Sequence, residues 1–277
     1  MEIKVSGMSF GYGDLPVLHG IDLTLDEPGL VCIIGPNGVG KSTLIKCINR
    51  ILTPTSGKVE VDGINIQEIP LKELSKVMGY VPVTSSDSFS MSVLDTVLMG
   101  RHPHQRMGIT TDLDMRIARR SLNMMGIRHL ALRGFDELSA GQHQKVAIAR
   151  GLAQTPRVLI LDEPTSNLDV RHQIHVTELL RDLARENGMT VLMISHDLNI
   201  SAKYADRIVM MALPGIIHKV GTPEEVITEE SIRYVYGVEC RIVDDGGRPH
   251  VILGEALPDE VIVEMHREDD NRFSGQS

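Results

Sequence analysis

Eight consecutive residues near the N-terminus constrain this chain more than any other feature. Residues 35–42 have the sequence GPNGVGKS, which matches the pattern G-x-x-x-x-G-K-[ST] in full. The apolar run 30–34 before it indicates a buried strand, and residues 42–52 carry apolar side chains at three- and four-residue steps, as a helix does. In this context backbone N–H groups and the positive end of the helix bind phosphate oxygens. The sequence therefore predicts a nucleotide-binding P-loop.

Two side chains of this loop have predicted roles of their own. We expect the Lys41 ammonium to reach the β- and γ-phosphates and the Ser42 hydroxyl to ligate Mg²⁺. A glycine-rich turn that matches the pattern by chance is the alternative, and the flanking strand and helix argue against it. The residues expected to surround the nucleotide phosphates are Gly35, Pro36, Asn37, Gly38, Val39, Gly40, Lys41, Ser42 and Thr43.

A second apolar run ends in two adjacent acids. Residues 158–161, VLIL, are followed by Asp162 and Glu163. We expect Asp162, at the end of a strand near the P-loop, to hold Mg²⁺ through a water, and Glu163 to polarise the water that attacks the γ-phosphate. Taken alone, two acids after a strand are as often solvated turn residues. The P-loop upstream favours the catalytic interpretation.

Composition limits which partners and which cellular location we expect for this chain. The 277 residues carry a net charge of −9 and include five Tyr, four Phe and no Trp, so we expect no nucleic-acid partner. Cys32, Cys47 and Cys240 form no CxxC pair, which indicates reduced thiols in a cytosolic protein. The N-terminal stretch lacks the pattern of a signal peptide, and no apolar run approaches the roughly 18 residues of a membrane span. We expect a soluble chain that meets a membrane only through a partner.

The order of apolar runs predicts an α/β fold with three parts. Short runs at 3–5, 21–25 and 59–61 indicate an N-terminal antiparallel β subdomain. From about 84 to 156 the patterns are helical, which we interpret as a helical subdomain inserted into the α/β domain. Later strands alternate with helices, as in a parallel sheet with crossover connections. The remaining expected elements are strands at 79–83, 157–161, 190–195 and 207–212 and helices at 92–100, 112–125, 141–153, 170–187 and 197–204.

The C-terminal residues differ from the rest of the chain. Residues 256–277 include many charged side chains and show no periodicity. We therefore expect one domain over 1–255 and a mobile tail over 256–277.

A third motif, LSAGQ at residues 138–142, allows comparison with a known family. The run 138–169, LSAGQHQKVAIARGLAQTPRVLILDEPTSNLD, resembles the signature sequence and the following motifs of ABC-transporter ATPases. Tyr12 is similar to the A-loop of that family, residues 166–169 to its D-loop, and His196 to its switch histidine. Six motifs in the family's order identify the chain, over about 1–255, as a member with the P-loop NTPase fold of ABC ATPases.

Within the family, the resemblance is strongest to import ATPases for iron–siderophore, haem and cobalamin. It rests on residues 97–104, VLMGRHPH, on residues 169–173, DVRHQ, and on a short region ending near 236–238. The resemblance implies an ATP- and Mg²⁺-dependent ATPase subunit on the cytoplasmic side of the membrane. Its partners would be permease subunits and a second ATPase subunit, with a substrate-binding protein involved indirectly. A non-transport ABC ATPase is the alternative.

The resemblance also implies that the ATP site is shared between two subunits. In the family's head-to-tail dimer, ATP lies between the P-loop of one subunit and the signature loop of the other. Ser139 and the N–H of Gly141 would contact the γ-phosphate across the dimer, at the start of a helix. Ala140 stands where the family usually has glycine, and Gln142 completes the signature loop.

Further roles follow from the same resemblance. Tyr12 would stack on the adenine, and His196 would hydrogen-bond the γ-phosphate. Asp169 would contact the partner subunit. Lys41 and His196 would stabilise the negative charge on the γ-phosphate, and Glu163 would orient the attacking water.

One position departs from the family pattern. The family normally has Gln after Tyr-Val-Pro, and this chain has Val83. That Gln usually ligates Mg²⁺ and senses the transporter subunit, and Val offers no polar atom. We therefore keep open a module that binds ATP and hydrolyses it weakly.

Two pairs of histidines are spaced closely enough to be considered as metal ligands. His102 and His104 are two residues apart and have no acid or cysteine nearby in the sequence, which disfavours a metal site. His172 and His175 lie three residues apart on a predicted helix, where we expect them to pair with neighbouring charges.

Overall fold

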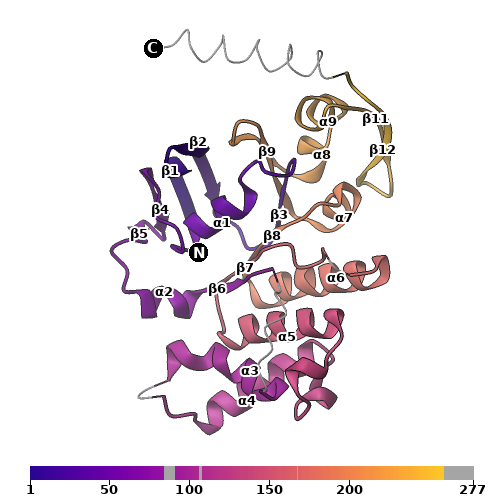
Figure 1. Ribbon diagram of the computed structural model, residues 1–277. Coiled ribbons are helices and arrows are strands. Elements are labelled where there is room, and N and C mark those ends of the chain that lie inside the picture. Colours follow the sequence, from indigo (N-terminus) through magenta and orange to yellow (C-terminus); the bar gives the residue numbers. More distant parts are fainter. Residues whose placement is uncertain (84–90, 106–107, 167, 259–277) are drawn as a thin grey trace.

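The computed structural model describes residues 1–83, 91–105, 108–166 and 168–258, and Figure 1 shows two lobes. The upper lobe contains three β-sheets and several helices, and the lower lobe is helical. The predicted tail lies outside the described residues except for 256–258. Here β12 runs through Ala256, and the Leu257 N–H donates to the Gly237 carbonyl.

A six-stranded sheet in the order β10-β9-β3-β8-β7-β6 forms the centre of the upper lobe. Five of its strands are parallel and β10 is antiparallel to β9. Its strands are β3 (Gly29–Ile34), β6 (Met78–Val81), β7 (Val158–Leu161), β8 (Thr190–Ile194), β9 (Arg207–Ala212) and β10 (Ile216–Gly221). Every residue of β3, β7 and β8 is buried, because helices or the second sheet cover both faces of these strands.

Strand β3 separates two hydrophobic cores. Leu30, Cys32 and Ile34 face the core that contains the helices of the lower lobe. Val31 and Ile33 face the other core, which contains the N-terminal sheet. The side chains of β3 therefore pack against both cores.

The N-terminal sheet has the antiparallel order β2-β1-β4-β5. Its strands are β1 (Ile3–Tyr12), β2 (Leu15–Leu25), β4 (Ser56–Val61) and β5 (Ile64–Asn65). Alternate side chains such as Ile3 and Val5 are buried against helix α1 (Lys41–Ile48), which starts at the P-loop. The predicted antiparallel β subdomain is confirmed.

Helices form the lower lobe, as predicted. They are α3 (Val93–Leu98), η1 (Met99–His104), α4 (Asp112–Met124), η2 (Arg128–Leu130), η3 (Phe135–Glu137) and α5 (Ala140–Ala153). Helix α4 begins where a capping box forms: the Thr111 hydroxyl accepts the Asp114 N–H, and the Asp114 carboxylate accepts the Thr111 N–H.

A buried ion pair joins three of these helical segments. Arg101 Nε donates to Asp114 Oδ1 at 2.9 Å, and both side chains are about 5% exposed or less. Arg101 Nη1 also donates to the Ala153 carbonyl at 2.8 Å, at the end of α5. One guanidinium therefore connects η1, α4 and α5.

The structure corrects the bounds of one strand and two helices and adds several elements. The strand expected at 79–83 is Met78–Val81, and residues 82 and 83 lie beyond it. Proline has no N–H to continue a ladder, which explains the stop at Pro82. The helix expected at 42–52 is α1 and ends at Ile48, and the helix expected at 92–100 is α3 followed by the 3-10 helix η1.

Helices α6 (Val170–Asn187) and α7 (Leu198–Tyr204) agree with prediction. The elements without a prediction are β5, α2 (Leu71–Val77), η2, η3, β10, α8 (Pro223–Val226), α9 (Glu229–Tyr236), β11 (Val238–Asp244) and β12 (Pro249–Ala256).

Candidate nucleotide site

The P-loop joins β3 to α1 as the sequence predicts. Gly40 occupies the N-cap of α1 with φ 101°, a conformation that side chains disfavour, and a Cβ there would lie 2.8 Å from Leu18. No side chain caps this helix end. The first N–H groups of α1 therefore face the loop, as an anion site requires.

Lys41 lies at the bottom of this loop. Its side chain is 5% exposed, and Nζ donates to the carbonyls of Gly35 and Pro36 at 2.8 Å each. Burial lowers the pKa of Lys41, while the nearby carboxylates of Glu163 and Asp162 raise it. The ammonium must turn from these carbonyls to reach a phosphate.

Ser42 and Asp162 form a pair of oxygen donors beside the loop. The Ser42 hydroxyl donates to Asp162 Oδ1 at 2.8 Å, although the two residues are 120 positions apart. The Asp162 N–H donates to the Val81 carbonyl, so the main chain of β6 holds the residue at the end of β7. A hydroxyl and a carboxylate in contact suit Mg²⁺, which prefers oxygen ligands and keeps several waters.

A tyrosine that the sequence motifs do not include contacts the same carboxylate. The Tyr80 hydroxyl donates to Asp162 Oδ2 at 3.2 Å. Burial and the Asp162 carboxylate both raise the pKa of Tyr80, so it remains a donor at neutral pH. No sequence motif predicts this contact, because the two residues are 82 positions apart.

Glu163 and His196 meet at the ends of two adjacent parallel strands. Glu163 follows β7, His196 follows β8, and His196 Nε2 lies 2.7 Å from Glu163 Oε1. Both side chains are partly exposed, 27% for Glu163 and 40% for His196. Two of the three residues with predicted catalytic roles are therefore in contact with each other.

Tyr12 ends strand β1 and is 53% exposed. Its ring packs edge-on against Phe10, with centroids 4.9 Å apart and planes at 85°. The ring thus contacts Phe10 while much of the Tyr12 side chain remains exposed and open to a flat ligand.

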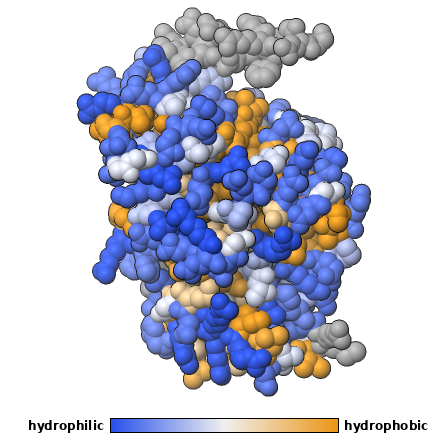
Figure 2. Space-filling view, turned by 180° about the vertical axis from the view of Figure 1, so that it is seen from behind, coloured by the Kyte–Doolittle hydropathy of each residue, from blue (hydrophilic) through white to orange (hydrophobic). Residues whose placement is uncertain are grey.

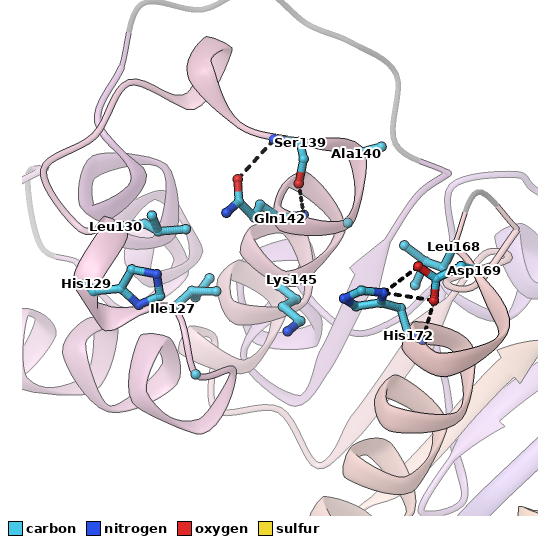
Figure 3. A pocket seen from close by; sticks show the side chains of 12 residues that line it. Ile127, His129, Leu130, Ser139, Ala140, Gln142, Lys145, Leu168, Asp169 and His172 are labelled. Carbon is cyan, nitrogen blue, oxygen red and sulfur yellow. Dashed lines mark hydrogen bonds and ion pairs between the residues drawn. The ribbon is translucent and has the colours of Figure 1, made fainter.

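The signature residues line a hollow of about 420 Å³ (Figure 3). Ser139 is the N-cap of α5: its hydroxyl accepts the Gln142 N–H, and its own N–H donates to Gln142 Oε1. Helix α5 begins at Ala140, one residue earlier than expected. Gly141 faces Leu168, and a Cβ at Gly141 would lie 3.4 Å from that side chain.

The other wall of this hollow comes from the segment that resembles a D-loop. Asp169 caps α6, and its carboxylate contacts the N–H and the Nδ1 of His172 at 2.8–2.9 Å. The N–H and ring of His172 lower the pKa of Asp169. Figure 3 shows Lys145 projecting between His129 and His172. Neither Lys145 nor His129 was predicted, and Asn167 lies outside the described residues.

The predicted site residues fall into two groups. The hollow is lined by residues of 126–130, 139–145 and 168–172, and no P-loop residue is among them. Lys41, Ser42, Asp162, Glu163 and His196 belong to the other group. Each chain therefore presents a phosphate-binding group and a separate signature group.

Val83 is 44% exposed and follows the end of β6. Thr84, the nearest hydroxyl in the sequence, lies outside the described residues. Of the histidines weighed as metal ligands, His104 contacts the Gln154 carbonyl and His172 pairs with Asp169. In the described part of the chain, no cluster of three His, Cys, Asp or Glu side chains is arranged to bind a metal.

Comparison with known proteins agrees with this geometry. The family described as ABC transporter matches residues 18–166. The ferric enterobactin transport ATP-binding protein FepC of Escherichia coli is 37% identical over 261 residues, which are 93% of this chain and 96% of FepC. The chain therefore belongs to the ABC transporter family. It is an ATP-binding subunit, similar to the ATP-binding subunits of importers for iron–siderophore, haem and cobalamin. These subunits are ATPases.

Solved structures agree with the fold. An inward-facing putative metal-chelate type ABC transporter has a TM-score of 0.79 and 29% identity, over 91% of this chain and 97% of that one. The dimeric cassette MJ0796 has a TM-score of 0.70 and 29% identity, over 79% of this chain and 98% of that one. The predicted fold class is confirmed.

Proposed function

We propose that this chain is the ATP-hydrolysing subunit of an importer for a metal chelate, an iron–siderophore, haem or cobalamin. The observation that carries the proposal is the Ser42–Asp162 contact beside the P-loop, with Glu163 and His196 at the neighbouring strand ends. The similarity to FepC and to the metal-chelate type transporter supports this substrate class.

Each residue of the phosphate-binding group has a step to perform. Lys41 leaves the loop carbonyls and binds the β- and γ-phosphates, while Ser42 and Asp162 hold Mg²⁺. Mg²⁺ at this site neutralises charge on the phosphates. Glu163 orients the attacking water, and His196 stabilises the charge that develops on the γ-phosphate.

Because the signature residues lie apart from the P-loop residues, a complete ATP site needs a second subunit. In a head-to-tail dimer, Ser139 and the N–H groups of Ala140 and Gly141 face the γ-phosphate bound by the partner. The Ser139 hydroxyl accepts one hydrogen bond as a cap and keeps its proton to donate. The existence of a dimeric cassette of this fold supports the arrangement.

The lower lobe offers a surface for the permease. A groove near Leu71, Lys72 and His102 lies between α2 and η1, and the exposed apolar side chains around this lobe include Met99 and Ile109. Figure 2 shows apolar surface over this lobe. In the ranges that the structure describes, no helix has the length and apolar character to cross a bilayer. From its similarity to ATP-binding subunits of importers, we propose that the chain acts at the cytoplasmic side of the membrane through a permease.

Uptake in cells tests the function. A strain that lacks this subunit should regain uptake of one radiolabelled substrate, chosen from a ferric siderophore, haem and cobalamin, when the wild-type gene is supplied. Glu163→Gln should restore none, because its amide cannot accept the proton of the attacking water. The purified variant should still bind ATP and should elute as a dimer in gel filtration with MgATP.

Two results would contradict this proposal. Restored uptake with Glu163→Gln removes Glu163 from the reaction. A wild-type gene that restores none of the three substrates favours a non-transport ABC ATPase. Glu137→Gln, an exposed acid on the helical lobe, is the matched control and should behave as wild type in both assays.

Val83 favours a second candidate, an ATP-binding module with weak hydrolysis. The position has an exposed apolar side chain where the resemblance expects a polar one. ATP turnover of the wild-type chain, measured with and without its permease, separates the two candidates. Turnover that stays near background in both settings favours the module.

A further inference from the structure

We propose that Tyr80 is a positioning residue for the magnesium site, acting by fixing the Asp162 carboxylate. This inference rests on the proposed roles of Ser42 and Asp162 and adds a residue that no motif of the chain contains. The observation behind it is that the Tyr80 hydroxyl, on strand β6, contacts the buried carboxylate of Asp162, which follows strand β7.

The Asp162 carboxylate is buried and held at both oxygens. Its residue is 3% exposed. Oδ1 accepts from the Ser42 hydroxyl at 2.8 Å, and Oδ2 accepts from the Tyr80 hydroxyl at 3.2 Å. A carboxylate with two different donors on its two oxygens has a defined rotation about its side-chain bonds.

Strand pairing determines that Tyr80 reaches this carboxylate. In the parallel register Tyr80 lies opposite Ile160, two residues before Asp162. The Tyr80 ring is half-buried and packs against the core that contains helix α1. The ring is therefore held by packing, and only its hydroxyl lies at the site.

The two hydrogen bonds on Asp162 use different oxygens. A hydroxyl would bind a cation through a lone pair and keep its proton, so Ser42 could ligate the ion and still donate to Oδ1. The Tyr80 hydroxyl donates to Oδ2 and takes no part in that contact. At Val83, where the resemblance expects an amide, the side chain has no polar atom. Tyr80 is thus a second donor, from outside the motifs, that helps to hold the orientation of the Asp162 carboxylate.

Tyr80→Phe tests the inference because it removes the hydroxyl and keeps the ring. The dissociation constant of a fluorescent ADP analogue is measured twice, once in EDTA and once in saturating Mg²⁺. The ratio of these constants reports how strongly the ion supports nucleotide binding. We expect Tyr80→Phe to reduce this ratio about fivefold, as loss of a hydrogen bond to a charged group allows, with the constant in EDTA unchanged.

Two other variants make the outcomes distinguishable. Asp162→Asn should abolish the effect of Mg²⁺, which tests the magnesium site itself. Tyr204→Phe is the matched control, because the Tyr204 hydroxyl also contacts a carboxylate, Glu178, at 3.3 Å, far in sequence from the P-loop. Its ratio should equal that of the wild type.

A direct readout uses the five tyrosines labelled as 3-fluorotyrosine. The ¹⁹F resonance that is missing in Tyr80→Phe should shift when Mg²⁺ is added to the ADP complex, and the resonance missing in Tyr204→Phe should not. If Asp162→Asn keeps the full Mg²⁺ effect, the magnesium site and the role of Tyr80 are both wrong. If Asp162→Asn loses it while Tyr80→Phe keeps the wild-type ratio and the resonance does not move, only the inference on Tyr80 is wrong.

Discussion

Glu163 adopts a backbone conformation that few non-glycine residues adopt. Its φ is 48°, and its carbonyl accepts the Ser166 N–H and hydroxyl at 3.3 and 3.1 Å. A left-handed non-glycine residue costs about 1 kcal/mol or more, and here the turn after β7 holds it in place. The result is a carboxylate 2.7 Å from His196. If His196 contacts the γ-phosphate through Nε2, as proposed, nucleotide binding has to separate these two side chains.

At position 83 we expect a gain in activity from Val83→Gln. Water can fill a vacant Mg²⁺ ligand position, so the affinity for MgATP should change little. A positioned polar group in a phosphoryl-transfer site is worth up to about 3 kcal/mol, or roughly a hundredfold in rate. The ATPase rate should therefore rise, most clearly with the permease present.

Steady-state ATPase assays with and without the permease check this prediction. Val83→Leu, which changes shape and adds no polar atom, should match the wild type. A Gln variant that is no faster than the Leu variant in either setting shows that Val83 causes no catalytic deficit.

Some site residues are predictable from the sequence and others are not. Lys41, Ser42, Asp162 and Glu163 lie in motifs whose spacing is local, and the structure brings these four to one edge of the sheet. Tyr80 reaches the same edge only through the pairing of β6 with β7, which no local pattern encodes. The roles of the motif residues stay predictions, since contact alone does not show catalysis.

Among the secondary elements, the segments around Arg101 depend on one buried contact. Removing one partner of a buried ion pair leaves an unpaired charge and typically costs about 3–5 kcal/mol. We expect Asp114→Ala to lower the free energy of unfolding by about this amount, because Asp114 also caps α4. Urea unfolding measures the change. The exposed pair Arg133–Glu137 is the matched control, and Glu137→Ala should cost about 1 kcal/mol or less.

The same pair gives a pH dependence with a definite sign. Burial raises the pKa of Asp114, but hydrogen bonds from Thr111 and Arg101 outweigh it and hold the pKa below the usual range for Asp. A depressed pKa contributes stability above the unfolded value of about 4, and this contribution is lost as the pH falls through the lower folded value. The stability difference between wild type and Asp114→Asn should therefore shrink in acid. A difference that stays constant down to pH 2 contradicts this account of the pair.

Elements with strong periodicity were predicted, and some exposed ones were missed. Helix α4 agrees with the expected 112–125 to within one residue, because its apolar face and its capping residues lie within one stretch. Strands β11 and β12 pair mainly with each other, and most of their residues are partly or fully exposed. The run 238–242 in β11, VECRI, does alternate apolar and polar side chains, so this strand was predictable, whereas β12 shows no such alternation.

For the whole molecule, the separation of the two groups predicts how activity depends on concentration. If ATP lies between two chains, hydrolysis by the isolated protein should rise more steeply than linearly with its concentration. Ser139→Arg should abolish turnover by filling the hollow with a bulky cation, and should leave nucleotide binding to the P-loop intact. ATPase rates over a dilution series and equilibrium binding of a fluorescent nucleotide measure these two effects.

Ile64→Arg introduces the same side chain at an exposed position in the N-terminal sheet and should behave as wild type. Hydrolysis in strict proportion to concentration down to the monomer range, or full activity of Ser139→Arg, would contradict a shared site.

The close packing around the P-loop has a consequence for the kinetics of nucleotide exchange. A Cβ on Gly35 would lie 2.5 Å from the Met211 carbonyl, and one on Gly40 would lie 2.8 Å from Leu18. Neighbours from both sheets thus hold the loop as a rigid template before any ligand arrives. Little backbone entropy remains to be lost on association, and the contacts of Lys41 require only that one ammonium group rotate. If ATP binds here as proposed, we expect its capture by a single chain to need little rearrangement of the main chain, which leaves the meeting of two chains as the slower step of the proposed cycle.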